Sequence, residues 1–333
     1  MRADTFDGEF SRTRLTKDPA PMRAILIHSE SAGARSLSSK ALLEMLQEAG
    51  YQAELHSPQD GIAGLPSDNT TMIIAAGGDG TVTKVVTAAP AGARVGVIPL
   101  GTANNIAHSL GIAGRPEEII AGWSTATSKS IDIWRANGPW GERIFIEGCG
   151  LGAIARANHH MDAHEITGHS PEHQISVARA ALTESLRHGK PVTARLTLDD
   201  STIEGQFLLV EILNFSAVGP RLPLAWSADP SDGLLEIGYS LADRYNEFCA
   251  WLSDGASPLS EAPVTLLRSR SVTVEWEHAR FRIGDDYWPV TGSPEPAGHY
   301  RAKIDLQSTG PCVLIPRAQP AAAGLEPARP DGV

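Results

Sequence analysis

The sequence predicts two domains, an N-terminal α/β domain and a C-terminal domain of short β-strands. In the first third of the chain, apolar runs such as Ile73–Ala76 and Val95–Ile98 end in glycine-containing turns and lead into helical patterns. From about residue 136 onward, the pattern changes to short runs rich in β-branched and aromatic residues between turn residues. A chain of 333 residues is long enough to bury the cores of two such domains.

The first domain is expected to alternate strands with helices. Further strands are predicted at Arg23–His28 and Ala53–His56. Apolar residues recur at helical spacing before Gly50 and Gly111, and glycine is typical of the position that follows a helix. The predicted helices lie around Leu42–Ala49, over Val82–Ala89 and Ile106–Leu110, and from Pro116 to about Ala126.

The second domain is expected to be β-sandwich-like, because its strands are short and regularly interrupted by turns. Two helical patterns interrupt them, one over Ile175–His188 and one that starts at Asp243. A last strand is predicted at Val313–Pro316. The other predicted strands are Ile144–Glu147, Val192–Leu198, Phe207–Asn214, Leu234–Tyr239, Val264–Leu267, Val272–Trp276 and Phe281–Ile283.

Composition and charge exclude several classes of protein. The formal net charge is −11, which argues against a nucleic-acid partner and against strong general attraction to anionic membranes. No apolar run approaches the roughly 20 residues that span a bilayer, and Met1–Pro21 lacks the apolar segment of a signal peptide. The three cysteines are widely spaced and fit a reducing compartment, so we expect a cytoplasmic protein.

Two glycine turns carry the chemistry of the predicted first domain. The first is Gly77–Thr81, with the sequence Gly-Gly-Asp-Gly-Thr, and the second is Pro99–Asn105, with the sequence Pro-Leu-Gly-Thr-Ala-Asn-Asn. Glycine allows backbone to approach a ligand closely, and the helix that follows offers unpaired N–H groups to an anion. Such turns meet at the carboxyl edge of an α/β sheet, where ligands bind. For a single turn of this kind, an ordinary strand-to-helix connection would be the alternative.

This pair of motifs resembles the catalytic domain of the diacylglycerol kinase family, which includes bacterial lipid kinases and sphingosine kinases. The first motif more distantly resembles NAD kinases and the phosphofructokinase-like fold. The resemblance covers roughly residues 22–316. It implies an NAD kinase/phosphofructokinase-like nucleotide domain, followed by a β-sandwich domain that binds the acceptor. It also implies an ATP- and Mg²⁺-dependent kinase that phosphorylates a hydroxyl of a diacylglycerol-like or other amphipathic acceptor.

The resemblance assigns the nucleotide site residue by residue. Asp79 takes the position of the acid that also binds the catalytic Mg²⁺ between phosphates. Ser57 ends a predicted strand where the family has a nucleotide-contacting hydroxyl. The implied nucleotide-binding residues are Ser31, Gly33, Ser57, Gly77, Gly78, Asp79, Gly80, Thr81, Gly101, Thr102, Asn104 and Asn105.

A loop in the second domain resembles the family's structural Mg²⁺ site. The resemblance makes Asp232 the carboxylate ligand, with Asp229 and Leu234 supplying neighbouring oxygens. Taken alone, the Asp-Gly sequence at this point is typical of a simple β-turn.

The catalytic base is expected after the predicted strand Phe281–Ile283. Relatives carry Asp-Gly-Glu here, whereas this chain has Ile283-Gly284-Asp285-Asp286-Tyr287. Alignment on the strand gives Asp286 the role of the base, and a shift by one residue gives it to Asp285. The alternative is a solvated hairpin turn without a catalytic role.

Several positions depart from the family pattern and keep other functions open. Ser29-Glu30 replaces Asn-Pro, Lys84 stands where glutamate is common, and Asn105 stands where many relatives have aspartate. An amide cannot act as a base. The alternatives are therefore an NAD kinase-like enzyme and a nucleotide-binding relative without catalysis.

A histidine cluster lies outside the family pattern. His160 and His164 have the i, i+4 spacing of a helical metal site, but a solvated segment is the expectation favoured here. The position of this segment, just after Gly148–Gly152, suggests that it borders the acceptor pocket. The full cluster is His159, His160, His164, His169 and His173, with Asp162 and Glu165.

The domain boundaries complete the expectations. The nucleotide domain is placed at residues 22–136 and the β-sandwich acceptor domain at residues 137–310, with the strand at 311–316 returning to the first domain. Residues 1–21 and 317–333 are expected to be disordered. The resemblance also implies a homodimer and transient contact with a membrane surface.

Overall fold

The computed structural model describes most of the chain. The described residues are 22–29, 37–56, 65–66, 70–161, 170–257, 260–290, 293–294 and 296–317, with the side chains of 158–161 excepted. In these parts of the chain, no helix combines the length and the apolar character needed to cross a bilayer.

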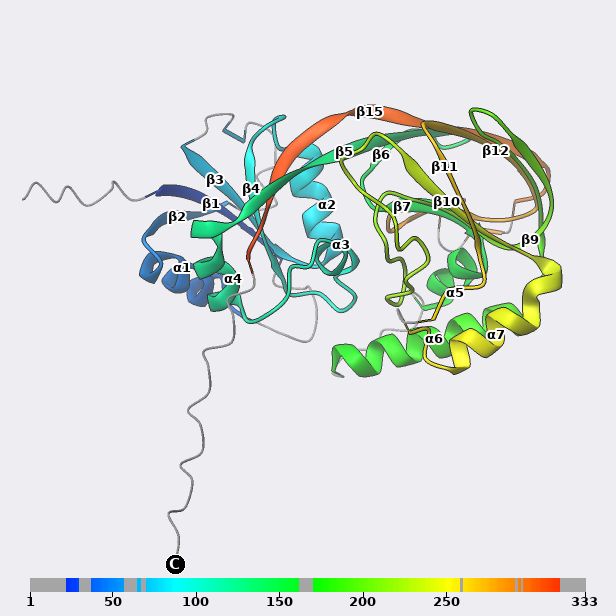
Figure 1. Cartoon of the computed structure of the whole chain (residues 1–333), viewed down its shortest axis with the longest axis horizontal. Helices are drawn as coiled ribbons and strands as arrows, with labels where there is room; N and C mark the ends of the chain where they lie inside the picture. The colour runs from blue at the N-terminus through cyan, green and yellow to red at the C-terminus, as the bar shows by residue number, and fades with distance from the viewer. Residues whose placement is uncertain are drawn as a thin grey trace, which may run out of the picture.

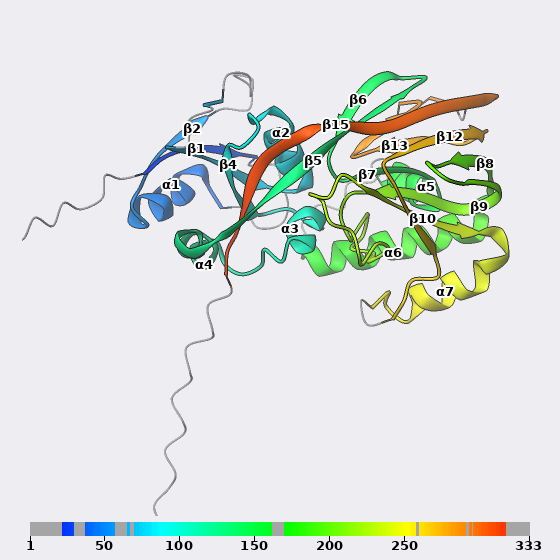
Figure 2. The same ribbon diagram turned by 45° about the horizontal axis from the view of Figure 1, so that its top comes forward.

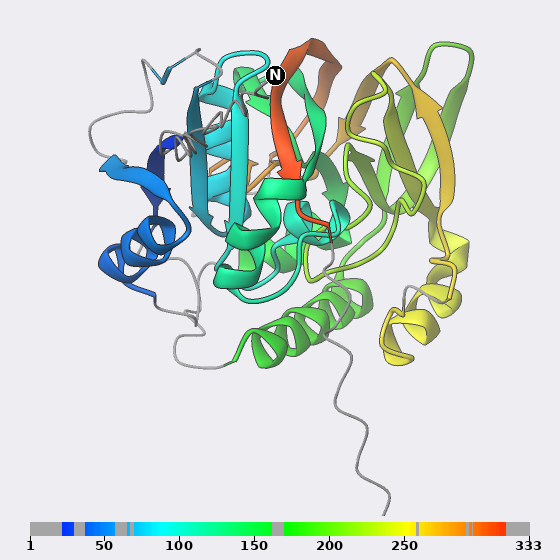
Figure 3. The same ribbon diagram turned by 60° about the vertical axis from the view of Figure 1, so that its left-hand side comes forward.

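The N-terminal half is built on a parallel sheet with the strand order β2-β1-β3-β4. Every residue of β3 is buried, which explains its continuous apolar run. Helices α1 and α4 contact each other beside this sheet (Figure 3). Helix α2 packs on the side that faces the C-terminal half (Figure 1). The elements are β1 (Met22–His28), α1 (Ser39–Glu48), β2 (Tyr51–His56), β3 (Thr71–Gly77), α2 (Asp79–Ala88), β4 (Arg94–Pro99), α3 (Asn105–Ser109), α4 (Pro116–Gly122) and the 3₁₀ turn Trp123–Thr125.

Two long strands join the halves. The strands β5 (Thr127–Gly138) and β15 (His299–Ile315) pair antiparallel along most of their length. The first part of β15 pairs with β12, and Cys312 and Val313 near its end pair in parallel with β4. The chain therefore ends its last strand inside the N-terminal sheet, and Figure 2 shows this ribbon crossing the whole molecule.

The C-terminal half consists of antiparallel strands around an apolar core of large aromatic side chains, including Trp134, Phe207 and Trp276. Helices α5 (Ala153–Met161), α6 (Pro171–His188) and α7 (Tyr245–Ser253) lie together along one side of these strands (Figure 2). The strands are β6 (Gly141–Phe145), β7 (Gly148–Gly152), β8 (Val192–Thr197), β9 (Thr202–Leu213), β10 (Leu235–Leu241), β11 (Thr265–Ser269), β12 (Ser271–Glu277), β13 (Phe281–Ile283) and β14 (Asp286–Trp288), and the 3₁₀ turn Ala242–Arg244 precedes α7.

The predicted fold class, α/β followed by an antiparallel strand-rich domain, is confirmed. The sequence pattern missed the long strand β5 and predicted only the end of β15, at Val313–Pro316. It also missed β7, which reads Gly-Cys-Gly-Leu-Gly. Glycine is depleted in strands, so such a run does not look like one. The reason for the glycines is space, because a Cβ on Gly150 would lie 2.4 Å from the Val210 carbonyl oxygen and 2.6 Å from Glu211 Oε2.

A buried ion pair ties β9 to β13 across β7. Arg282 Nη2 donates to Glu211 Oε2 at 2.6 Å, and the two side chains are only 3% and 0% exposed. Gly150 pairs with both Arg282 and Glu211 in the sheet, so the ion pair spans the strand that lacks side chains there. This tie holds the β13 end that leads into Gly284 and Asp285.

We expect Arg282→Met to lower the free energy of unfolding by about 3–5 kcal/mol, because it leaves the Glu211 carboxylate buried without its cation. Urea denaturation followed by circular dichroism measures this loss. The double variant Arg282→Met/Glu211→Gln should recover most of it, since no unpaired charge remains. A single variant as stable as the unaltered protein would contradict this role.

Candidate functional site

Two glycine turns touch each other at the carboxyl edge of the parallel sheet. A Cβ on Gly101 would lie 2.5 Å from Gly78 Cα, so the two backbones approach more closely than any side chain allows. The amide of Leu100 donates to the Gly77 carbonyl at 2.9 Å, which joins the turns after β3 and β4. Thr81 packs over Gly77, where a Cβ would lie 2.4 Å from the Thr81 hydroxyl oxygen. The structure thus brings the two predicted motifs into one place.

Asn104 holds the second turn in shape. Its φ is +49°, a left-handed conformation that asparagine tolerates better than most residues. Its side chain accepts from the Gly101 amide at 2.9 Å and donates to the Gly101 carbonyl at 2.7 Å. These two hydrogen bonds between Asn104 and Gly101 therefore stabilise the conformation of the turn.

Asp79 is the first residue of α2, and its carboxylate also holds the start of α3. Oδ2 accepts from the Asn105 amide and Oδ1 from the Ile106 amide, both at 2.9 Å. Burial raises the pKa of Asp79 to about 6 against the lowering effect of these two amides, and the nearby Asp285 adds to the rise. The group is thus ionised at neutral pH but close to titration.

Glu147 is a buried acid next to Asp79 that the sequence reasoning did not single out. Burial, together with the negative charges of Asp79 and Asp285, raises its pKa to about 8. Asn105 donates its side-chain amide to Glu147 Oε1 and to the Gly219 carbonyl, both at 3.0 Å. The available signal was an acid at the end of an apolar run, immediately before the glycine strand.

The structure distinguishes between the two candidate bases. Asp285 lies in the turn between β13 and β14, and a Cβ on Gly80 would lie 3.0 Å from its Oδ2. Asp285 also acts electrostatically on both Asp79 and Glu147. Asp286 is exposed in β14 and pairs with Ile283. Both acids are exposed, but the two-residue turn brings Asp285 near Asp79 and Glu147, whereas the alignment favoured Asp286. The role of base stays a prediction for both.

Thr102 and Arg221 connect the second turn to the C-terminal half. The Thr102 hydroxyl donates to Gln174 Oε1 of α6 at 2.6 Å. Arg221 donates from Nε to the Ala103 carbonyl at 2.7 Å and from Nη2 to the Thr102 carbonyl at 3.0 Å. Together with the bond from Asn105 to Glu147, these contacts hold both halves against the two turns.

Some of the predicted residues lie outside the part of the chain that the structure describes. Ser31, Gly33 and Ser57 lie outside the described residues, as do His164 and His169 and the side chains of His159 and His160. His173 is described in the first turn of α6.

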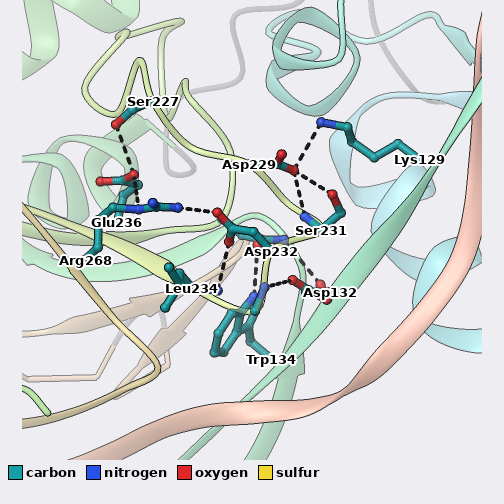
Figure 4. Close-up of polar contacts among 12 residues, drawn as sticks. Lys129, Asp132, Trp134, Ser227, Asp229, Ser231, Asp232, Leu234, Glu236 and Arg268 are labelled. Atoms are coloured by element: carbon teal, nitrogen blue, oxygen red, sulfur yellow. Dashed lines mark hydrogen bonds and ion pairs between the residues drawn. The ribbon is translucent and has the colours of Figure 1, made fainter.

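The loop predicted to bind a metal has its carboxylates paired with basic side chains (Figure 4). Asp229 accepts from Lys129 at 3.1 Å and from Ser231, and Asp232 pairs with Arg268. Figure 4 also shows Asp132, which accepts from the Gly233 amide at 2.7 Å. Burial and the nearby Asp232 and Asp229 raise the pKa of Asp132.

As arranged, this loop does not fit a hard cation such as Mg²⁺. The Asp232 carboxylate accepts from the Leu234 amide at 2.9 Å and faces Arg268, so basic groups stand where a cation would. Among the described residues, no group of three or more His, Cys, Asp or Glu side chains is arranged to bind a metal. The metal-binding role of Asp229, Asp232 and Leu234 stays a prediction.

Asp79 fits a different mode of Mg²⁺ binding. Each of its oxygens accepts one amide hydrogen, which leaves acceptor capacity on both. Mg²⁺ is commonly held by one or two carboxylates together with substrate phosphates and water. A single ionised carboxylate between two glycine turns suits that mode.

Comparisons with known proteins agree with this geometry. Residues 23–136 match the family model of the diacylglycerol kinase catalytic domain. The chain is 29% identical over 230 residues to a diacylglycerol kinase of Bacillus subtilis (strain 168), covering 65% of this chain and 72% of the relative.

A second relative is a YegS-like lipid kinase homologue of Stenotrophomonas maltophilia (strain K279a). It is 31% identical over 221 residues, which cover 60% of this chain and 65% of the relative. This chain thus spans slightly less than two thirds of that protein.

The fold has solved counterparts as well. The structure of a diacylglycerol kinase from Bacillus anthracis str. Sterne superposes with a TM-score of 0.60 at 16% identity, covering 89% of this chain and 97% of that chain. At this identity the likeness concerns the fold. The matched family model over residues 23–136, the lipid kinase homologues and the two glycine motifs confirm the predicted resemblance to the diacylglycerol kinase catalytic domain family.

Proposed function

We propose that this chain is an ATP- and Mg²⁺-dependent lipid kinase that phosphorylates a hydroxyl of a diacylglycerol-like or other amphipathic acceptor. The observation that supports it best is the position of Asp79. This buried carboxylate lies where two glycine turns meet, is fixed by two amides of α3, and has Glu147 and Asp285 beside it. Phosphoryl transfer requires little more than such positioning and charge stabilisation.

The nucleotide phosphates would lie against the two turns. The residues proposed to cradle them are Gly77, Gly78, Gly80, Thr81, Gly101 and Thr102, and the N-terminus of the ten-residue helix α2 adds a partial positive charge. Mg²⁺ bound with the nucleotide would neutralise phosphate charge, with Asp79 as its protein ligand.

Asp285 is the proposed base. It is exposed, and no described residue forms a hydrogen bond with its carboxylate, so its oxygens are free to accept a proton. The acceptor hydroxyl would lose its proton to Asp285 as its oxygen bonds to the γ-phosphorus. The bond between that phosphorus and the bridging oxygen breaks at the same time, and ADP leaves.

The protonation states of the two buried acids differ at neutral pH. Asp79, with a pKa of about 6, is ionised, whereas Glu147, with a pKa of about 8, carries a proton. Low-dielectric surroundings disfavour two adjacent buried charges. With Asp79 ionised and Glu147 protonated, one negative charge remains where a cation and phosphates would meet. Glu147 is thus proposed as a neutral neighbour that positions Asn105.

The acceptor would meet the site from the C-terminal half. We propose residues 22–136 as the nucleotide domain and residues 137–310 as the acceptor domain, with residues 311–316 belonging to the first. A lipid acceptor also implies transient contact of a cytoplasmic enzyme with a membrane surface, and a homodimer remains proposed.

Transfer of labelled γ-phosphate from ATP to acceptors in mixed micelles tests the function. The panel holds diacylglycerol, monoacylglycerol, ceramide, sphingosine and phosphatidylglycerol, with NAD alongside. We expect a labelled lipid product.

We expect Asp285→Asn to lower kcat by about 10²–10⁴-fold, as for loss of a general base. The matched control Asp286→Asn changes the neighbouring exposed acid and should keep kcat within about twofold, because a surface substitution away from the site has little effect.

Other outcomes would support one of the alternative functions. Labelled NAD would indicate the NAD kinase-like alternative. Binding of ATP without any labelled product, together with an Asp79→Ala variant that behaves identically, would indicate a nucleotide-binding protein without turnover. A loss of activity in Asp286→Asn but not in Asp285→Asn would return the role of base to Asp286.

The raised pKa of Glu147 predicts a stability that falls as pH rises. Between the ordinary glutamate pKa of 4.5 and about 8, the folded state keeps a proton that the unfolded state has released. The free energy of unfolding should fall across this window by at most about 1.4 kcal/mol per pH unit and level off above it. Thermal unfolding from pH 5 to pH 9 measures this dependence.

The variant Glu147→Gln is the matched control, because its amide oxygen still accepts from Asn105. We expect it to lose the fall in Tm between pH 6 and pH 8 and to exceed the unaltered protein in Tm at pH 9. Parallel pH profiles for the two proteins would show that Glu147 is not the titrating group.

Chelation should separate catalysis from stability. EDTA is expected to abolish phosphoryl transfer but to leave the Tm of the nucleotide-free protein unchanged, because Lys129 and Arg268 already balance the acidic loop. In the variant Arg268→Gln, Mg²⁺ should raise the Tm, since Asp232 then lacks its cation. A Tm of the unaltered protein that falls with EDTA and recovers with Mg²⁺ would instead establish the predicted loop site.

A further inference from the structure

A cavity of about 1050 Å³ lies in the C-terminal half, away from the glycine turns. One wall is the C-terminal half of α6, from Val177 to His188. The other walls come from Gly152 at the end of β7, from Gly189–Thr193 before and within β8, and from Glu277–Arg280 between β12 and β13.

The cavity and the catalytic carboxylates lie at opposite ends of the β7–β13 pair. Glu147 precedes β7, whereas Gly152 ends it, and five residues of strand span about 16 Å. The antiparallel partner β13 has Asp285 beyond one end and Arg280 beyond the other. The end of the cavity at Gly152 and Arg280 therefore lies at the far end of this strand pair from the site at Asp79.

Arg280 places a buried positive charge in the cavity wall. Arg280 is only 5% exposed. Its guanidinium donates to the main-chain carbonyl of Pro289 at 2.7 Å and to those of Val290 and Ser293. Within the described parts of the chain, its partners are these main-chain carbonyls, and no carboxylate pairs with it. A buried charge normally has a counter-charge, because desolvation is costly.

Two more cations line the same cavity. Arg156 lies against Gly189, where an added Cβ would be 2.5 Å from both Nε and Nη2, so the glycine makes room for the guanidinium. Lys190 is exposed and makes no ion pair with the described residues. Cationic residues from three separate elements therefore line this cavity.

The acids of the cavity are already paired. Glu184 contacts Arg187 and also His188, at 3.1 Å, and Glu277 contacts His299 at 3.0 Å. Among the described residues, the lining thus holds three cations (Arg156, Lys190 and Arg280) and two acids, in a chain whose net charge is −11. Positively charged residues gathered around one cavity, in a protein whose net charge is negative, indicate an anionic ligand.

Part of the remaining wall is apolar, with side chains of Val177 and Ala181 on α6, of Pro191 and Val192, and of Ala279. The polar side chains of Ser185, His188, Thr193 and His278 complete the lining. We propose that this cavity binds an amphiphile with an anionic headgroup, the headgroup held by Arg280, Arg156 and Lys190 and the apolar part lying along α6. Arginine binds phosphate and carboxylate through paired N–H groups, and apolar walls bury an alkyl chain. Binding here does not require turnover and so does not depend on the proposed kinase activity.

The test is titration calorimetry of the full chain with dodecyl phosphate below its critical micelle concentration. Dodecyl maltoside is the neutral amphiphile of equal chain length, and inorganic phosphate is the anion without a chain. We expect one molecule of dodecyl phosphate per chain, bound at least about tenfold more tightly than either control, a difference of about 1.4 kcal/mol.

Variants tie the binding to the cavity. Arg280→Met should weaken dodecyl phosphate binding about tenfold or more, and Lys190→Gln about threefold, in line with loss of a buried and an exposed charge-assisted contact. Ala181→Glu, which adds a carboxylate to the wall without disturbing the helix, should weaken it as strongly as Arg280→Met. The matched control Arg143→Gln removes an exposed cation on β6, outside the cavity, and should bind like the unaltered protein.

Three results would overturn the proposal. These are equal binding of dodecyl maltoside, equal binding of inorganic phosphate, and unchanged binding in Lys190→Gln and Ala181→Glu. If circular dichroism shows that Arg280→Met does not fold, Lys190→Gln and Ala181→Glu decide the question alone.

Discussion

The site depends on one carboxylate that holds two helices together. Asp79 begins α2, and its two oxygens accept the first amides of α3. These amides have no partners within their own helix, so a carboxylate at this point satisfies them and complements the helix dipole. Because Asn105 reaches from the same turn to Glu147 and Gly219, the geometry around Asp79 also fixes how the C-terminal half meets the first.

The concentration of buried acids has a cost, which the surroundings offset in different ways. Asp79 is stabilised by amides, Glu211 by Arg282, and Glu147 by keeping its proton at neutral pH. Asn105 becomes understandable in this setting. An amide can donate to both Glu147 and Gly219, whereas an aspartate there would add a further negative charge and could donate to neither.

The two halves are connected by sheet rather than by a flexible linker. The ribbon of β5 and β15 runs from the C-terminal half into the parallel sheet, where β15 pairs with β4. Helix α6 also connects the two halves, since Gln174 contacts Thr102 while residues between Val177 and His188 line the cationic cavity. The turns, the buried acids and the cavity are therefore attached to the same few elements.

The sequence alone determined the fold class and the two glycine motifs. Both depend on local information, namely hydrophobic periodicity and glycines at turns, and the motif spacing carried the family resemblance. Most helices and strands were placed within a few residues of their observed ends for the same reason.

Tertiary structure decided the rest, because the remaining contacts join residues far apart in the chain. Glu147 meets Asn105 across 42 residues, and Lys129 meets Asp229 across 100. The strand β7 was hidden because its glycines are required by the neighbouring Val210 and Glu211 rather than by any local pattern. The turn geometry likewise presents Asp285 instead of Asp286 to the site, and a one-residue difference in register is set by strand pairing, which no local pattern records.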